Sequence, residues 1–154
     1  MSVVAWDGRF LAADRCLISS GMRQFGSKMI VTRIKNKPNT VIAWTGNHSQ
    51  GLALARWYLC GEKTKKWPAF QSSDDWTRLI VASGGCVWCY EQLPERLCVD
   101  DEFSAWGSGR DYAMGAMRMR ASAKEAVEVA CSFDINCGFG AEVHKAYLDE
   151  GEAF

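Results

Sequence analysis

The cysteines are the first residues of this sequence whose chemistry has to be considered. There are seven, an odd number with irregular spacing, which is typical of free thiols rather than of a disulfide framework. Cys86 and Cys89 form a single Cys-x-x-Cys pair inside a run of strand-forming residues. Residues three apart on a strand point to opposite faces. We therefore expect no metal site, no redox pair and no cofactor there.

The two histidines, His48 and His144, have no spaced partners that could share a metal ion with them. A structural role, on the surface or partly buried, is the simpler interpretation of both. The sequence also lacks the GxxxxGK[ST] loop that cradles nucleotide phosphates. Any ATPase that works with this protein is therefore expected to be a separate chain.

Length and composition indicate one ordinary globular domain. The 154 residues are 48% hydrophobic and carry a formal net charge of +0, so we expect a single domain over 1–154 and no nucleic-acid partner. No apolar run approaches the roughly 20 residues of a membrane span, and the first residues do not resemble a signal peptide. The expected location is the cytoplasm, without membrane contact.

The elements that would position a site fall into segregated blocks. Apolar runs on both sides of Asp7-Gly8 predict a hairpin, and helical spacing with a Ser122 capping box predicts helices later in the chain. The expected strands cover 3–6, 9–13, 29–34, 40–45, 79–82, 86–90 and 103–106, and a last short strand starts at 137. The expected helices cover 49–60, two segments within 109–133, and 142–150, with loops at 21–26 and 62–75. Segregated blocks favour an α+β fold with antiparallel sheets.

Five segments, taken in order, resemble proteasome β-subunits and the bacterial ATP-dependent peptidase related to them. The opening at 2–15 resembles their first hairpin, which ends Ala-Ala-Asp, and is most similar to short phage and prophage members. The other four are Gly-Ser-Lys-Met-Ile at 26–30, Val-Ile-Ala-Trp-Thr-Gly at 41–46, Ala-Trp-Gly-Ser-Gly at 105–109 and Asp-Ile-Asn-Cys-Gly at 134–138. The last has Cys137 where the family has serine.

This resemblance implies a fold and an activity. The fold would be a four-layer αββα N-terminal-nucleophile (Ntn) hydrolase sandwich of two antiparallel sheets, with the family's second helix shortened to 73–78. The activity would be amide-bond hydrolysis on a peptide or protein substrate by a homo-oligomer. Ring formation stays open because that helix helps to pack subunits in the family. A separate ATPase unfoldase would be a partner.

The resemblance also implies the site residues. Ser2 would be the nucleophile after removal of Met1, and its α-amine, with an ordinary pKa of about 7.7–8.0, would be the base. Lys28 would supply a positive charge that Asp14 holds in place. Asp134 and Ser108 would belong to the catalytic group, with Ser108 either assisting proton transfer or simply capping the helix that follows. N–H groups near Gly46 and Asn47 would bind the oxyanion.

Several alternatives remain open at this stage. A two-residue turn at Asp7-Gly8 puts Met1 opposite Asp14, whereas a three-residue loop puts Ser2 there. Without the resemblance, Ser2 is an ordinary second residue, Asp14 ends a strand and Lys28 is a loop charge. A catalytically inactive Ntn-fold assembly or binding protein is therefore the main alternative function. A small-molecule acylase on the same fold is another.

Overall fold

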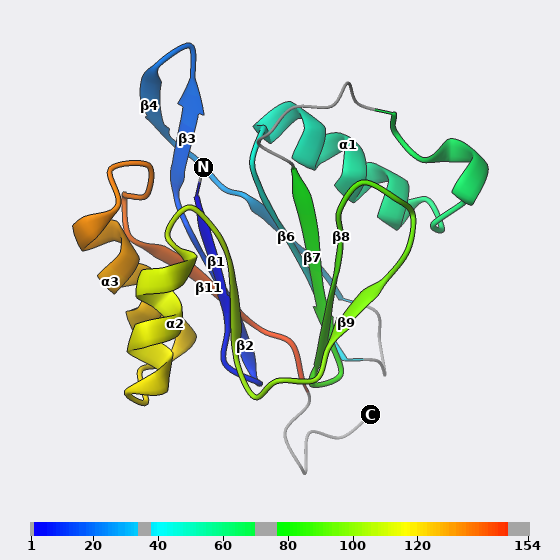
Figure 1. Ribbon diagram of the computed structural model, residues 1–154. Helices are drawn as coiled ribbons and strands as arrows, with labels where there is room; N and C mark the ends of the chain where they lie inside the picture. Colours follow the sequence, from blue (N-terminus) through cyan, green and yellow to red (C-terminus); the bar gives the residue numbers. More distant parts are fainter. Residues whose placement is uncertain (1, 34–37, 70–76, 148–154) are drawn as a thin grey trace.

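The computed structural model describes residues 2–33, 38–69 and 77–147 and shows four layers. Two antiparallel sheets lie face to face, α2 and α3 cover the outer side of one, and α1 covers the outer side of the other (Figure 1). This is the α+β, αββα sandwich that the sequence predicted. No helix in these ranges is long and apolar enough to cross a membrane.

The four-stranded sheet carries the N-terminus of the chain. Its strand order is β10-β1-β2-β11. The bounds are β1 Val3–Trp6, β2 Phe10–Asp14, β10 Ser104–Gly107 and β11 Ala141–Lys145. Strand β1 is central and buried along its whole length, so the residue before it, Ser2, is delivered to an interior position.

The second sheet has five strands in the order β5-β6-β7-β8-β9. Its bounds are β5 Met29–Thr32, β6 Thr40–Thr45, β7 Arg78–Ser83, β8 Cys86–Tyr90 and β9 Leu97–Val99. On β8, Cys86 is exposed and Cys89 is buried, so the two thiols lie on opposite faces as their spacing predicted.

The helices begin where the sequence provides caps. Asn47 accepts a hydrogen bond from the Gln50 N–H at the start of α1, and Ser122 and Glu125 form the predicted capping box of α3. Such caps satisfy backbone donors that the first turn leaves unpaired. The bounds are α1 His48–Leu59, α2 Arg110–Arg118 and α3 Ala123–Phe133, with one 3₁₀ turn, η1, at Thr64–Lys66.

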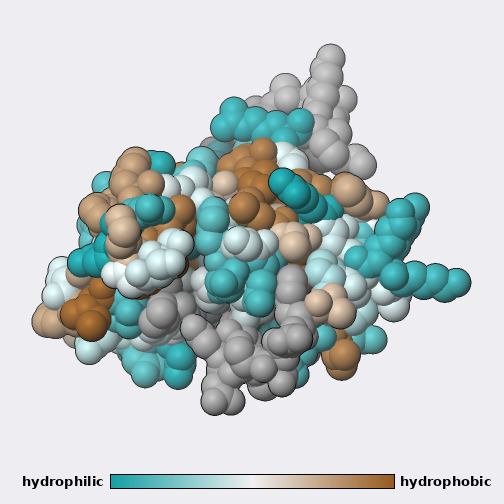
Figure 2. Space-filling model, turned by 90° about the horizontal axis from the view of Figure 1, so that it is seen from above, coloured by the Kyte–Doolittle hydropathy of each residue, from teal (hydrophilic) through white to brown (hydrophobic). Residues whose placement is uncertain are grey.

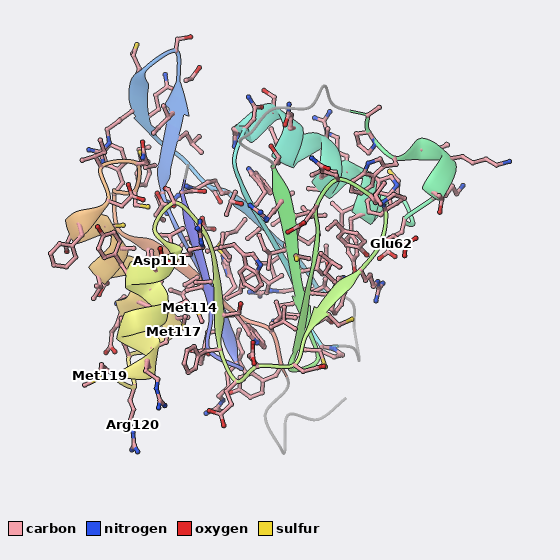
Figure 3. The ribbon with its side chains drawn as sticks, in the orientation of Figure 1. Glu62, Asp111, Met114, Met117, Met119 and Arg120 are labelled. Atoms are coloured by element: carbon pink, nitrogen blue, oxygen red, sulfur yellow. The ribbon has the colours of Figure 1, made fainter. Side chains whose placement is uncertain are left out.

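Three hydrophobic clusters hold the layers together. The first lies between the sheets and includes Val4, Leu11 and Ile80. The second joins α2 and α3 to the four-stranded sheet, and Met117 of α2 belongs to it, whereas Met119 beyond the helix end is 83% exposed (Figure 3). The third packs α1 onto the five-stranded sheet.

Some expected elements differ from the structure. The segment 142–150 was predicted as a helix, but Ala141–Lys145 forms strand β11, which pairs with β2; residues 148–150 lie outside the described residues. The polar stretch after Gly21 was predicted as a loop, but β3 Cys16–Ser19 and β4 Met22–Phe25 form a separate hairpin. Most of the shortened second helix, expected at 73–78, lies outside the described residues, and Arg78 belongs to β7.

Neither expected register of the first hairpin is observed. Trp6 pairs with Leu11 and Val4 with Ala13, so the next pair brings Val3, not Met1 or Ser2, opposite Asp14. The turn residues are Gly8 and Arg9. Gly8 takes the positive φ of 95° that this turn requires, and the Asp7 carboxylate accepts hydrogen bonds from the N–H groups of Arg9 and Phe10.

We predict opposite effects for two helical glycines replaced by alanine. A Cβ at Gly51 of α1 would lie 2.1 Å from the buried Trp44 ring, whereas a Cβ at Gly115 of α2 would meet nothing within 4 Å. Gly51→Ala should therefore lower the free energy of unfolding by about 1–3 kcal/mol. Gly115→Ala should raise it by up to about 1 kcal/mol through helix propensity. Urea unfolding measures both, and equal effects would contradict the packing of α1 on β6.

Candidate functional site

A buried ion pair lies at the end of the sandwich where the chain begins. The Lys28 Nζ donates to Asp14 Oδ1 at 2.5 Å and to the Cys16 carbonyl at 2.8 Å. Both side chains are almost completely buried, at 3% and 0% exposure. Burying two charges is costly unless they are paired and otherwise hydrogen-bonded, so the surroundings must supply further partners.

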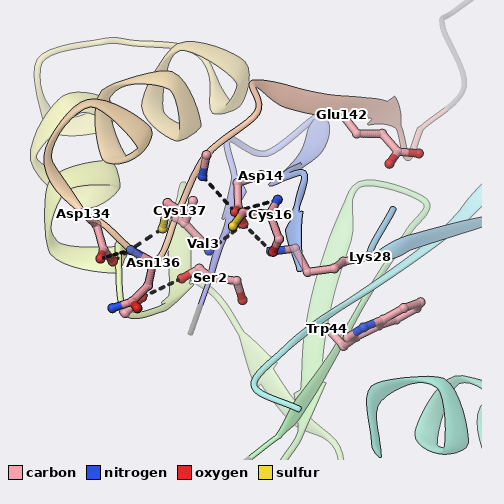
Figure 4. Close-up of polar contacts among 12 residues, drawn as sticks. Ser2, Val3, Asp14, Cys16, Lys28, Trp44, Asp134, Asn136, Cys137 and Glu142 are labelled. Carbon is pink, nitrogen blue, oxygen red and sulfur yellow. Dashed lines mark hydrogen bonds and ion pairs between the residues drawn. The ribbon is translucent and has the colours of Figure 1, made fainter. Parts of the chain in front are cut away.

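The backbone supplies those partners to Asp14. Oδ1 also accepts from the Val3 N–H at 3.0 Å, and Oδ2 accepts from the N–H groups of Cys16 and Gly138, each at 3.2 Å (Figure 4). The carboxylate thus joins the start of β1, the end of β2, the start of β5 and the segment after α3. It is the point at which four parts of the chain meet.

Ser2 lies directly beside this pair. It precedes Val3, whose N–H binds the same Asp14 oxygen as Lys28 does. Its side chain is 0% exposed, and its hydroxyl has no hydrogen-bond partner in the described structure. A buried hydroxyl without a partner is costly and rare. Among the described residues, three other buried side-chain atoms share this state, and Ser2 differs from them in preceding Val3, a donor to Asp14.

The carbonyl of Ser2 is fixed by the segment that leads into α2. It accepts from the Gly109 N–H at 3.2 Å and from the Ser108 hydroxyl at 3.4 Å. Gly107 passes so close that a Cβ there would lie 2.1 Å from this oxygen, and its φ is +97°. Only glycine satisfies both conditions without strain, so the Gly-Ser-Gly sequence clamps Ser2.

Ser108 also bonds to Asp134, so it links Asp134 to Ser2. Burial alone would raise the pKa of Asp134, but hydrogen bonds from Ser108, Asn136 and Cys137 outweigh it and lower the pKa. Cys137 donates its thiol to the Asp134 carboxylate at 3.4 Å. Burial, together with the charges of Asp14 and Asp134, raises the pKa of Cys137, so it remains a protonated thiol.

The two expected oxyanion donors, Gly46 and Asn47, differ in whether their N–H groups are already engaged in a hydrogen bond. The Asn47 N–H donates to the Thr77 hydroxyl at 3.1 Å, and the Asn47 side chain caps α1, so neither is free for a ligand. Gly46 follows β6 with a φ of +91°, and its N–H remains the candidate oxyanion donor.

His48 lies near this position. Burial and the Lys28 charge lower the pKa of His48, whose Nδ1 is 3.2 Å from the Trp44 Nε1. Trp44 can only donate, so His48 accepts.

The structure thus places Ser2, Asp14, Lys28, Ser108 and Asp134 in one connected group, and Gly46 and Asn47 at the start of α1. The sequence analysis missed the backbone donors of Val3, Cys16 and Gly138. The Asp-x-x-Cys-Gly segment was a signal for the last of them, because its glycine is the Asp14 donor. The Val3 donor follows from the hairpin register, which was wrong, and the Cys16 donor is a local contact two residues after Asp14. Among the described residues, no group of three His, Cys, Asp or Glu could hold a metal ion.

Comparison with known proteins identifies the fold. No family model and no curated protein matches the sequence. Among solved structures, BPH from Thiobacillus denitrificans, in complex with epoxomicin, aligns with a TM-score of 0.68 and 21% identity, over 96% of this chain and 100% of that chain.

Two further neighbours agree with it. Eukaryotic HslV from Trypanosoma brucei has a TM-score of 0.64 and 16% identity, over 94% of this chain and 97% of that chain. Anbu (ancestral beta-subunit) from Yersinia bercovieri has a TM-score of 0.72 and 11% identity, over 97% and 88%. These are proteasome-type Ntn-hydrolase proteins, so the chain has the fold that its sequence resembled.

We predict strong coupling between the two halves of the ion pair. Asp14→Asn removes the negative charge that balances the buried Lys28 ammonium, and should cost about 3–5 kcal/mol of unfolding free energy. Lys28→Met leaves Asp14 with three N–H donors and should cost less. The double variant should lose clearly less than the sum of the two, in urea unfolding. Additive losses would show that the two charges do not depend on each other.

Proposed function

We propose that this protein is an Ntn peptidase of the proteasome type, which hydrolyses amide bonds with the Ser2 hydroxyl after Met1 has been removed. The observation that carries the proposal is the buried, unpartnered hydroxyl of Ser2 beside the Asp14–Lys28 pair. The fold of the neighbours supports it, because the chain spans nearly their whole length.

The reaction begins at the N-terminus. Once Met1 is absent, the Ser2 nitrogen is a free α-amine whose ordinary pKa, about 7.7–8.0, suits a general base at neutral pH. The amine takes the hydroxyl proton while Oγ attacks the substrate carbonyl, and the Lys28 ammonium provides the nearby positive charge. Asp14 orients that ammonium and, through the Val3 N–H, the backbone that carries the nucleophile.

Two further steps complete turnover. The Gly46 N–H is the donor proposed for the oxyanion of the tetrahedral intermediate, a contribution typically worth roughly 10²–10³ in rate. Collapse of the intermediate releases the amine product, which receives the proton from the α-amine, and leaves an ester on Ser2. Water, deprotonated by the same α-amine, then hydrolyses the ester. Ser108, bonded to the Ser2 carbonyl and to Asp134, holds the N-terminus in position.

The substrate, on this proposal, is a peptide or an unfolded protein segment, and the active form is a homo-oligomer. The HslV-like neighbours support an oligomeric peptidase, and a separate ATPase unfoldase remains a candidate partner. A small-molecule acylase would use the same residues. A panel of peptide amides and N-acyl amides separates these two activities.

One observation favours a second function, that of a non-catalytic assembly or binding protein. Ser2 is 0% exposed, so its hydroxyl is not open to a substrate in this structure. If Met1 is retained, the Ser2 nitrogen is an amide without basic character. The intact mass of the purified protein distinguishes the two cases.

We predict that Ser2→Ala separates activity from stability. In protein shown by mass to lack Met1, the variant should lose at least about a thousandfold of peptide-amide hydrolysis, because the nucleophile is gone. Its melting temperature should be unchanged or slightly higher, because the removed hydroxyl makes no hydrogen bond.

The control is Ser132→Ala. Ser132 is an exposed α3 residue whose hydroxyl donates to the Glu128 carbonyl in the preceding helical turn, so the variant should keep full activity. Equal activity of Ser2→Ala and wild type would refute the Ser2 mechanism. Absence of activity in wild type, with Met1 removed, would favour the non-catalytic protein.

A further inference from the structure

A basic pocket lies on the outer side of α1, away from the candidate active site. It is a hollow of about 230 Å³ between the end of α1 and the segment that follows it. Ala53, Trp57 and Pro68 form its apolar lining. Arg56, Lys63 and Lys66 also line it, and all three are exposed. Hydrophilic side chains project from the right-hand edge of the molecule in Figure 2.

The walls of the pocket are held firmly. The Trp57 indole N–H donates to the Lys63 carbonyl at 2.9 Å, and the Trp57 and Trp67 rings pack edge to face with centroids 4.7 Å apart. The segment after α1 is thereby fixed against the helix. The shape of the pocket is therefore fixed by these two contacts between α1 and the segment that follows it.

Within the described part of the chain, none of the three cations forms an ion pair with a carboxylate. The nearest acid along the chain, Glu62, is bonded to Arg96 at 2.8 Å instead (Figure 3). Like charges gathered around one hollow repel each other and attract an anion. The lining is complementary to a ligand that carries several negative charges and an apolar group.

The chain itself contains such a segment. Residues 149–154 read Asp-Glu-Gly-Glu-Ala-Phe, with three carboxylates and one phenyl ring. The carboxylates match the three cations in number, and the phenyl ring matches the apolar lining. We propose that the pocket binds segment 149–154 of a second copy of this chain.

A second copy fits better than the same chain. Ala146 packs between the two sheets and bonds to Arg9 and Gly85, at the turns β1–β2 and β7–β8. The pocket lies on the far side of α1, beyond the five-stranded sheet. Contact between two different surfaces of identical chains is heterologous, and such contacts close into rings or extend as filaments.

The first experiment measures binding of the segment alone. The probe is a fluorescent peptide with the sequence of residues 147–154. The receptor is the full chain with its own acids neutralised by Asp149→Asn, Glu150→Gln and Glu152→Gln. Fluorescence anisotropy should show saturable binding that weakens as salt rises. Arg56→Glu with Lys66→Glu should weaken it at least tenfold.

The control variant is Lys65→Glu. Lys65 is an exposed residue of the same 3₁₀ turn that does not line the pocket, so it should leave peptide affinity within about twofold. Circular dichroism melts confirm that each receptor is folded. Equal loss in control and pocket variants, or no binding to a folded receptor, would overturn the proposal.

The second experiment tests whether the contact joins two copies. In sedimentation velocity, reversing the pocket charges or the segment charges alone should reduce the assembled fraction of the full chain, and combining both reversals should restore it. If the acid-neutralised chain sediments like wild type, or if the wild-type chain is a monomer, the second-copy assignment is wrong. Neither result depends on Ser2, so this test is independent of peptidase activity.

Discussion

The buried carboxylate of Asp14 is the constraint on which the rest of the site depends. A charge in the interior is tolerated only where it is paired and hydrogen-bonded, and Asp14 obtains its partners from Lys28 and from the N–H groups of Val3, Cys16 and Gly138. These come from segments far apart in the sequence. Satisfying one carboxylate therefore fixes where the chain begins, where β5 begins and where the segment after α3 passes.

The packing of the two sheets holds β1 in the position that the Asp14 contacts require. Strand β1 is buried on both faces, between the inter-sheet cluster and the cluster beneath α2 and α3. A strand in this position cannot shift without moving every side chain to the wrong face. The residue before it is held equally firmly by Gly107, Ser108 and Gly109. The scaffold thus fixes the position of Ser2, whose hydroxyl has no hydrogen-bond partner among the described residues.

The sequence predicted the layers well because its local signals agreed with the final fold. Turn residues marked the hairpins, and the Ser122–Glu125 capping box marked α3. Strand β11 was missed because its pairing with β2 is remote in sequence, and pairing of that kind overrides local preference. The register was missed because Gly8, rather than Asp7, takes the first turn position. Motifs in the sequence identified the side chains of the site. They could not identify the backbone N–H donors, because almost any residue type can supply a backbone N–H group.

Ser2 is the reactive group in the proposed mechanism, and covalent labelling tests this most directly. A peptide inhibitor that carries a hydroxyl-reactive electrophile would be incubated with protein shown by mass to lack Met1, and the modified residue would be mapped by peptide mass spectrometry. We expect one equivalent of inhibitor on Ser2, and none after Asp14→Asn has disturbed the pair beside it. An adduct on a cysteine, or no adduct on a free Ser2 terminus, would contradict the account.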